Sequence, residues 1–383
     1  MGNTKSLYKM IVDEIEEGIR DRKYKPGDRI PTENELAQKF GVSRITVTRA
    51  TQELELKGYI YRNKRKGSFI CDSLDPLSMG KAAIASPSRG NLFLPLVMPF
   101  KEQIGYDILH GVEEEVKKYH HFVSVHNTGY DEFEERNIVE TLIKNDVKGM
   151  IVYPCSSQKN ISLFSGLLIK KMPFVLIDRA IEGIEAPLVT SNNHKGFMDL
   201  ISYLFSLGHK KIGFVSTSMK EFNSSYNRYR GYCQAHIDAG IEVSSDLIYD
   251  RFLKDWQHID DAMAFEDINL HAANETLDYY MNMKDRPTAI AAVNDMTAIF
   301  LVKAAIRKGI AIPQDLSITG FDNLSMCEHL DVPLTTVEQP FAAIGARAAQ
   351  LLISSIKNET TCIKHELVDT KLVIRNSTSP PKG

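Results

Sequence analysis

The stretch IPTENELAQKFGVSRITVTRATQELELKGYIYRNKRKGSFI (Ile30–Ile70) contains the signals for several consecutive structural elements. Thr32, followed three residues later by Glu35, has the form of a capping box and predicts the start of a helix. Gly41 is expected to end this helix, and Ser43 is a suitable N-cap for the next one. Two helices joined by so tight a turn predict a helix-turn-helix.

Apolar spacing before and within this stretch predicts three amphipathic helices with a shared core. The side chains expected to face inward are Leu7, Met10, Ile11, Ile15 and Ile19, then Leu36, Ala37 and Phe40, then Val47, Ala50 and Leu54. After Gly58, the segments YIYR and SFIC flank Asn63–Gly67, which predicts a β-hairpin with a basic tip. We therefore expect residues 1–71 to form a winged helix-turn-helix domain.

The charge of the chain is divided unevenly along its length. Residues 1–72 contain 15 Lys and Arg against 11 Asp and Glu, whereas the remainder contains 31 against 38. The bias is sharper between residues 39 and 70, where only Glu53 and Glu55 are acidic and the basic residues are Lys39, Arg44, Arg49, Lys57, Arg62, Lys64, Arg65 and Lys66. A basic module on an acidic body indicates contact with a polyanion.

The third predicted helix has the side chains that suit DNA. Arg44, Ile45, Thr46, Thr48 and Arg49 lie off its buried stripe and close to its N-terminus, the part of a recognition helix that reaches base edges. Arginine can bond guanine through two hydrogen bonds, and hydroxyls and helical N–H groups can bind phosphate. The hairpin tip, which carries Lys64, Arg65 and Lys66, suits backbone or minor-groove contact. The alternative is a solvated basic face on a protein-interaction domain.

The same stretch resembles the signature of GntR-type regulators in its P-T-E-x-E-L-A, F-G-V-S-R-x-T-V and terminal G-S-F blocks, and the likeness covers residues 5–71. The resemblance implies that operator DNA is contacted by Glu33, Ser43, Arg44, Thr46 and the wing around Lys66 and Gly67. Many members have Arg where this chain has Thr48, so Arg49 is the candidate substitute. The resemblance also implies binding as a homodimer to inverted half-sites of double-stranded DNA.

Beyond residue 71 the chain changes character. Residues 72–91 contain Pro76, Gly80, Pro87 and Gly90 without a sustained period, which predicts a linker. From residue 92 to 383, short apolar runs alternate with amphipathic stretches such as Tyr106–Tyr119 and Glu134–Asn145. The runs expected to be strands are Leu92–Val97, Val123–His126, Gly149–Tyr153, Phe174–Ile177, Lys211–Val215, Leu247–Tyr249, Ala289–Val293 and Ser317–Gly320. This alternation predicts an α/β fold with parallel sheets, long enough for two Rossmann-like lobes.

A second resemblance is to the effector domain of LacI/GalR-type repressors, which is similar to type I periplasmic binding proteins. The segments that carry it are VLIDRAI, SNNHKG, LGHKKIGFV, NRYRGY, PTAIAAVND, IPQDLSITGFDN and VPLTTVEQP, in this order between residues 175 and 340. The resemblance implies one lobe of about 92–190 and 322–336, and another of about 191–321 and 337–375. The combination of the two domain types resembles the arabinose repressors.

Ligands of open α/β sheets bind beyond the carboxyl ends of the strands. Asp295 follows the strand Ala289–Val293, and Arg228 lies in a loop that opens a helix, so a carboxylate and a guanidinium are expected to bond neighbouring hydroxyls. Asp178 and Arg179 either bind ligand or pair with each other. The aromatic ring that lies on a sugar face is either Phe252 or Trp256. Further residues expected at the cleft are Phe100, Lys101, Gln103, Tyr153 and Asp322.

The sequence also excludes several classes of protein. No apolar run approaches the ~18–20 residues of a membrane span, and the N-terminus lacks the apolar core of a signal peptide. The five cysteines are scattered without C-x-x-C spacing, so we expect no metal, no cofactor and reduced thiols in the cytoplasm. No catalytic motif is present, and an enzyme is not expected.

Taken together, these patterns predict a cytoplasmic regulator that represses carbohydrate-utilisation genes. Its operator binding would be controlled by a monosaccharide between the lobes, with L-arabinose the first candidate by resemblance. Two alternatives stay open. The effector could be a non-sugar metabolite, or the acidic body could only dimerise.

Overall fold

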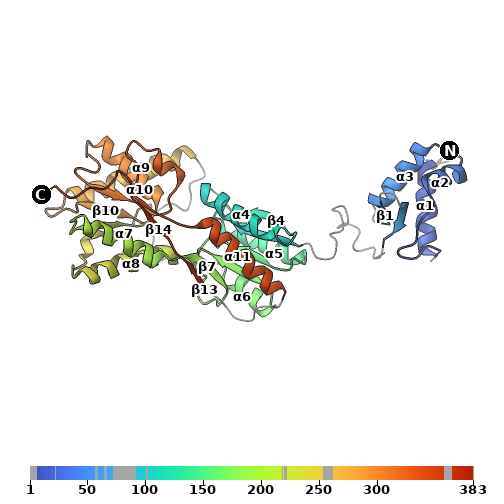
Figure 1. Ribbon diagram of the computed structural model, residues 1–383, viewed down its shortest axis with the longest axis horizontal. Helices are drawn as coiled ribbons and strands as arrows, with labels where there is room; N and C mark the ends of the chain where they lie inside the picture. Colours follow the sequence, from blue (N-terminus) through green and yellow to red (C-terminus); the bar gives the residue numbers. More distant parts are fainter. Residues whose placement is uncertain are drawn as a thin grey trace. The chain divides into compact units, whose positions relative to one another are not determined.

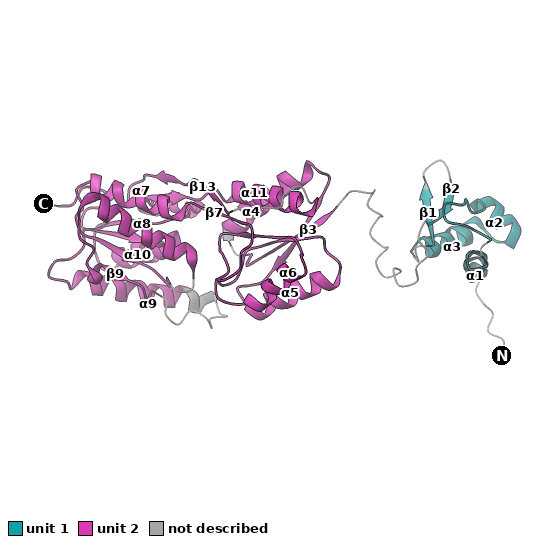
Figure 2. Ribbon diagram, turned by 90° about the horizontal axis from the view of Figure 1, so that it is seen from below, with its two compact units in different colours: residues 1–90 teal, residues 91–383 magenta. Residues whose placement is uncertain are grey.

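The computed structural model describes residues 7–21, 23–56, 59–63, 67–71, 92–100, 102–217, 219, 222–252, 262–357 and 365–382. The chain divides into two compact units, residues 1–90 and 91–383, which Figure 2 distinguishes by colour. Each unit is described by itself.

The first unit is the expected winged helix-turn-helix. Its elements are α1 (Leu7–Arg20), α2 (Glu33–Phe40), α3 (Arg44–Leu56), β1 (Ile60–Asn63) and β2 (Gly67–Ile70). The two strands pair antiparallel, with Ile60 opposite Ile70 and Asn63 opposite Gly67. The hairpin tip, with Lys64, Arg65 and Lys66, lies outside the described residues.

Local signals place the helices of this unit. The backbone N–H of Thr32 donates to Oε2 of Glu35 at 2.7 Å, and the N–H of Glu35 donates to Oγ1 of Thr32 at 3.3 Å, which completes the capping box. Gly41 ends α2 with a φ of +62°, a conformation that glycine adopts without strain.

A shared apolar core holds α1, α2, α3 and the wing together. The fully buried side chains include Ile11, Val12, Ile15, Leu36, Val47, Ala50, Leu54, Ile60 and Ile70. One prediction for α1 is wrong, because Met10 is 46% exposed and the neighbouring Val12 takes its place inside. Val12 directly follows Ile11 and precedes Ile15 by three residues, so it lies on the same stripe, whereas Met10 points to the opposite face of the helix.

The first lobe of the second unit is built on a fully parallel six-stranded sheet in the order β13-β7-β6-β5-β3-β4. Its strands are β3 (Phe93–Met98), β4 (Phe122–Asn127), β5 (Met150–Val152), β6 (Phe174–Ile177), β7 (Leu188–Ser191) and β13 (His365–Val368). Its helices are α4 (Glu102–Lys117), α5 (Glu132–Lys144), α6 (Ile161–Ile169) and α11 (Phe341–Ile356). Helices α4 and α11 pack on one face of the sheet, and α5 and α6 on the other (Figure 1). Burial on both faces explains why β3, β5 and β6 read as continuous apolar runs.

The second lobe has a smaller parallel sheet in the order β11-β10-β8-β9. Its strands are β8 (Ile212–Val215), β9 (Ile248–Tyr249), β10 (Ala289–Ala292) and β11 (Ser317–Thr319). Helices α9 (Ala262–Met281) and α10 (Asp295–Arg307) cover one face, and α7 (Asn193–Ser206) and α8 (Asn223–Ala239) cover the other. Two short 3-10 helices, Ser245–Leu247 and Ser325–Glu328, lie in its loops. A separate antiparallel pair joins β12 (Thr336–Glu338) to β14 (Lys371–Val373).

The division of the C-terminal third between the lobes differs from the expected one. Helix α11 packs in the core of the first lobe and β13 extends its sheet, although residues 337–375 were expected in the second. Conversely, Leu324, Cys327 and Leu334 pack in the core of the second lobe, although residues 322–336 were expected in the first. Packing and strand pairing between segments far apart in the sequence decide which lobe each segment joins. Local sequence patterns do not contain this information.

The packing of α4 against α11 depends on two glycines. A Cβ atom at Gly111 would lie 1.8 Å from the carbonyl oxygen of Ala342, and one at Gly345 would lie 2.2 Å from that of Ile108. The helix backbones therefore meet with no room for a methyl group.

We predict that Gly111→Ala destabilises the second unit by about 1–3 kcal/mol, because the added methyl group forces the two helices apart. In an open helix the same change stabilises by about 0.5–1 kcal/mol. Urea unfolding followed by circular dichroism measures the difference.

Gly166→Ala is the matched control, since a Cβ atom there meets nothing within 4 Å in helix α6. It should unfold at the same or a higher urea concentration than the parent protein. Equal behaviour of the two variants would contradict the close approach of α4 and α11.

Candidate nucleic-acid interface and ligand cleft

The first turn of α3 presents the side chains expected to reach DNA. Ser43 accepts a hydrogen bond from the backbone N–H of Thr46 at 3.3 Å, and the two hydroxyls lie 2.9 Å apart. The Arg44 side chain is 72% exposed, and Ile45 beside it is 82% exposed. This turn therefore combines a hydroxyl pair, a cation and an apolar side chain.

Glu33 holds two arginines at this surface. Its Oε2 accepts from Nε of Arg44 at 3.3 Å, and its Oε1 accepts from a terminal nitrogen of Arg62 in β1 at 2.9 Å. The same nitrogen of Arg62 also donates to the hydroxyl of Thr51 at 3.2 Å. Glu33, expected to contact DNA, is thus placed where it orients Arg44 and Arg62. The bond to Arg44 runs through Nε, so the two terminal amino groups remain for the two acceptors of a guanine.

Thr48, Arg49 and Gly67, which were also expected to contact DNA, make contacts within the first unit itself. Thr48 donates its hydroxyl to the carbonyl of Arg44 at 3.0 Å, and the Arg49 guanidinium lies 4.4 Å from the ring centre of Tyr8 in α1. Gly67 opens β2 with a φ of +112°, and a Cβ there would lie 2.8 Å from Nε of Arg29. Gly67 is therefore required by the backbone of the wing.

In the second unit, Arg228 lies within helix α8, not in the loop before a helix as expected, and it is buried beside the carboxyl end of β10. It donates from Nε to Oδ1 of Asn193 at 2.7 Å and from NH1 to the carbonyl of Val293 at 2.6 Å. Its guanidinium lies 4.0 Å from the centre of the Phe321 ring, and its third nitrogen is 3.8 Å from Oδ1 of Asp322. Every nitrogen of this cation is therefore engaged or faces a carboxylate.

The two expected carboxylates have different positions. Asp295 is fully buried. It accepts a hydrogen bond from the N–H of Leu324 at 2.9 Å and another from the hydroxyl of Thr336 at 2.5 Å. These bonds connect the loop after β11 to helix α10. Asp295 does not cap this helix, because the N-cap is Asn294. Asp322 instead lines a cavity and accepts from Nε2 of Gln339 at 2.6 Å. The structure thus places Asp322, rather than Asp295, where a ligand can reach it.

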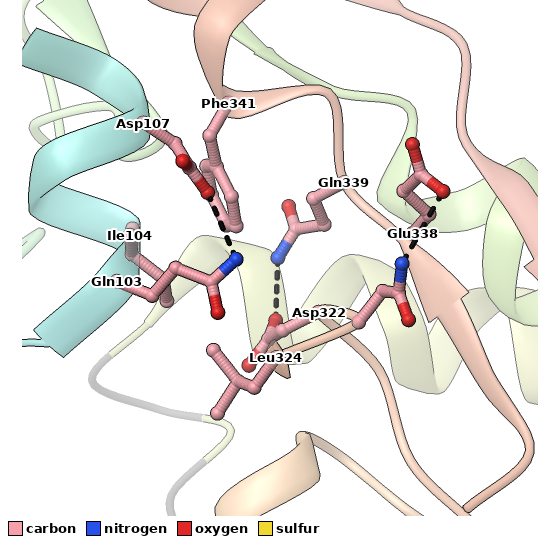
Figure 3. Close-up of a pocket in the computed structure, with 9 residues that line it drawn as sticks. Gln103, Ile104, Asp107, Asp322, Leu324, Glu338, Gln339 and Phe341 are labelled. Atoms are coloured by element: carbon pink, nitrogen blue, oxygen red, sulfur yellow. Dashed lines mark hydrogen bonds between the residues drawn. The ribbon is translucent and has the colours of Figure 1, made fainter. Parts of the chain in front are cut away.

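This cavity lies between the lobes and has a volume of about 110 Å³ (Figure 3). Its walls are formed by Gln103, Ile104 and Asp107 of α4, by Asp322, Asn323 and Leu324, and by Glu338, Gln339 and Phe341. Hydrogen bonds join neighbouring lining groups, and Oε1 of Gln103 accepts from the N–H of Ser325 at 2.6 Å across the lobes. Carboxylates and carboxamides that bond to one another can exchange these bonds for those of a polyhydroxyl ligand.

A second contact between the lobes surrounds Arg179. Its guanidinium lies 5.1 Å from the Tyr153 ring centre and 4.3 Å from that of Phe222, which precedes α8 in the other lobe. It donates to the carbonyl of Cys155 at 2.9 Å, and its Nε is 3.7 Å from Oδ2 of Asp178. Asp178 and Arg179 therefore do pair, and they do so at an interlobe surface beside Tyr153.

The remaining expected residues are dispersed. Phe100 packs edge-on against Tyr106 with ring centres 5.0 Å apart, and its N–H donates to Asn127. Phe252 has no exposed surface and packs in the apolar core of the second lobe. Lys101 and Trp256 lie outside the described residues.

Three of the residues at the contacts between the lobes have a strained backbone. Asp178, Asp322 and Asn323 have φ values of +61°, +140° and +58°, which L-residues seldom adopt. Strained residues persist where the surrounding structure requires them, and they cluster at binding sites.

Sequence reasoning missed several residues of the site, namely Asp107, Asn193, Phe222, Asn323, Glu338 and Gln339. Asn193, Asn323, Glu338 and Gln339 lie inside the SNNHKG, GFDN and VEQP segments, which carried a resemblance but no assigned role. Asp107 and Phe222 carried no signal, because only the approach of the two lobes brings them to the cleft.

Comparison with known proteins agrees with this architecture. Residues 7–70 match the bacterial regulatory proteins of the gntR family, and residues 201–378 match the periplasmic binding protein-like domain. The chain is 27% identical to an arabinose metabolism transcriptional repressor of Geobacillus stearothermophilus over 382 residues, which covers 97% of each chain. It is 26% identical to the transcriptional repressor CytR of Escherichia coli over 93% of this chain and 98% of that one. The crystal structure of the regulator CcpA of Lactococcus lactis matches with a TM-score of 0.65 at 21% identity, over 76% of this chain and 100% of that one.

The fold and the matches together define a DNA-binding transcriptional regulator. Its first unit is a GntR-type helix-turn-helix domain. Its second unit has the fold of the periplasmic binding protein-like domain, which it shares with the solved regulator of Lactococcus lactis. Its relatives over nearly the full chain are transcriptional repressors. Among the described residues, no helix combines the length and apolarity that crossing a membrane requires.

Burial raises the pKa of Asp322 to about 8, and the neighbouring Asp295 carboxylate acts in the same direction against the opposing effect of Arg228. In the unfolded chain this aspartate has a pKa of about 3.9. Between these two values the folded chain holds a proton that the unfolded chain has lost, so stability falls as the pH rises.

We predict that the melting temperature of the second unit falls by several degrees between pH 5 and pH 8, and that Asp322→Asn flattens this fall because asparagine does not ionise. Thermal unfolding by circular dichroism at a series of pH values measures both. Asp315→Asn is the control, since Lys382 lowers the pKa of Asp315 and confines its titration to acid pH. An unchanged slope in Asp322→Asn would show that Asp322 is ionised throughout.

Proposed function

We propose that this protein is a repressor whose operator binding is controlled by a small polar metabolite bound between the two lobes of its second unit. The observation that carries the DNA role is the first turn of α3, where Glu33 holds an exposed Arg44 beside the hydroxyls of Ser43 and Thr46. A guanidinium held by a carboxylate loses less side-chain freedom when it meets a base.

The lining of the cleft supports a polyhydroxyl effector. The cavity presents three carboxylates and three carboxamides, together with the apolar side chains of Ile104, Leu324 and Phe341. This combination suits a molecule with several hydroxyl groups and an apolar ring face, as in a monosaccharide. L-Arabinose is the first candidate, because a relative over nearly the whole chain is an arabinose metabolism repressor. A body that only dimerises would be expected to have a filled or apolar cleft, which this polar lining disfavours.

The mechanism we propose is a shift between two arrangements of the lobes. The lobes touch through Gln103 and Ser325 at one place and through Arg179 and Phe222 at another. A ligand that bonds to both lobes favours the closed arrangement by its differential affinity. In a homodimer, closure changes the spacing of the two winged helices through residues 72–91. The coupling required is about 1–3 kcal/mol, which is typical of allosteric proteins.

A mobility-shift assay with DNA from upstream of the protein's own gene, across a panel of monosaccharides, tests both roles. We expect binding without sugar and release by one of them. Arg44→Ala should abolish binding to this DNA, because the turn loses its guanine-reading cation. Arg228→Ala should bind DNA as before and no longer respond to the sugar, because the cleft loses the cation that orients Asp322.

Both variants should be checked for folding by circular dichroism. Sequence-specific binding that no sugar changes would contradict the monosaccharide and direct the search to other metabolites. A folded Arg228→Ala that fails to bind DNA would contradict the division of roles between the units.

The affinity for operator DNA should fall steeply with salt, because each phosphate neutralised by Lys or Arg releases counterions. The expected slope of log K against log salt is about −0.9 for each phosphate contact. Titrations by fluorescence anisotropy between 50 and 200 mM salt, a range over which the loss is large, measure it. A flat response would contradict the role given to the basic face of the first unit.

A further inference from the structure

The most exposed large apolar side chain in the described part of the first unit is Ile45, at 82%, whereas Met10 and Tyr61 are only about half exposed at 46% and 43%. Ile45 is the second residue of α3 and lies between Arg44 and Thr46. Isolated apolar residues on a surface are common and need no explanation by themselves. Ile45 differs because every other feature of its turn is suited to DNA.

The fold gives no structural reason for an isoleucine at this position. The buried face of α3 is formed by Val47, Ala50 and Leu54, and the core of the unit does not include Ile45. A β-branched residue on an open helical surface is also a poorer helix former than alanine. Neither packing nor helix propensity therefore explains the residue.

The chemistry of the major groove restricts what Ile45 can recognise. Its side chain has no hydrogen-bond donor or acceptor, so it cannot read guanine, adenine or cytosine through their polar edges. The C5-methyl group of thymine is the apolar feature that the major groove presents. Neighbouring residues of a helix point about 100° apart, so a base next to the one read by Arg44 lies within reach of Ile45.

We propose that Ile45 is a specificity-determining residue that packs on the methyl group of a thymine adjacent to the base pair read by Arg44. This inference rests on the proposed DNA-binding function and deepens it. The surrounding charge supports DNA as the partner, because the exposed guanidinium of Arg44 lies beside Ile45 and Arg62 is held by the same carboxylate. Burial of a methyl group against Ile45 then favours thymine at one position of each half-site.

The test uses a duplex enriched from a randomised DNA library by the full-length protein. Each thymine is replaced in turn by deoxyuridine, which lacks only the C5-methyl group. For the parent protein, one replacement near the guanine read by Arg44 should weaken binding about four-fold, the effect of one buried methyl group. Ile45→Ala should bind the thymine and deoxyuridine duplexes equally, and Ile45→Val should keep most of the difference.

Met10→Ala is the matched control, since it removes an exposed apolar side chain from α1 and should leave the four-fold difference intact. Melting temperatures equal to that of the parent would confirm that all variants are folded. If every deoxyuridine penalty is the same in Ile45→Ala as in the parent, the role of Ile45 is wrong while DNA binding stands. Failure of the parent protein to enrich any sequence would overturn the proposed function itself, and this inference with it.

Discussion

Arg228 is a buried cation, and the cleft edge of the second lobe depends on the need to satisfy it. A guanidinium removed from water is tolerated only where hydrogen-bond acceptors surround it. Its partners are Asn193, the carbonyl of Val293 and Asp322, which follow three different strands. Val293 and Asp322 follow the neighbouring strands β10 and β11 of the second lobe's sheet, whereas Asn193 follows β7 of the first lobe's sheet, so Arg228 joins segments of both sheets. The strained backbone at Asp322 is held there by the same contacts.

The first turn of α3, where we propose that DNA binds, uses a similar pairing of charges at an exposed site. Glu33 lies between Arg44 and Arg62, which belong to different elements of the first unit. Exposed ion pairs contribute little to stability. The ion pair between Glu33 and Arg44 instead orients the arginine, because it holds a flexible side chain where a base edge can meet it. Buried Arg228 thus organises the candidate ligand cleft, whereas Glu33 positions the exposed Arg44 to meet a polyanion.

In the described part of the chain, polar contacts join the lobes, and Ile104 of α4 adds an apolar one by packing against the core of the second lobe. Gln103 with Ser325, Arg179 with Phe222, and Ser157 with Asn223 join them at the cleft. Each lobe has its own apolar cores on both faces of its sheet, so neither relies on the other for stability. Such an arrangement allows the lobes to change their separation at modest cost, which an effector needs if its binding energy is to alter the spacing of DNA-binding domains.

Much of the fold could be predicted because its signals are local. The capping box at Thr32, the stop at Gly41 and the stripe of Val47, Ala50 and Leu54 each depend on residues a few positions apart. Strands β3, β5, β6, β8 and β10 read as apolar runs because both faces of their sheets are covered. The strands β7, β12, β13 and β14 were not predicted, because each contains polar or charged residues that interrupt the apolar run.

By itself, the sequence determined the winged helix-turn-helix, the alternation of strands and helices, and the place of Asp322 among the residues expected at the cleft. Only the tertiary structure decided that α11 and β13 belong to the first lobe, that Asp295 lies behind the cleft while Asp322 faces it, and that Glu33 holds two arginines. The physical reason is the range of the interactions. Caps and periodicity act within a few residues, whereas strand pairing and the satisfaction of a buried charge join segments that are distant in the chain.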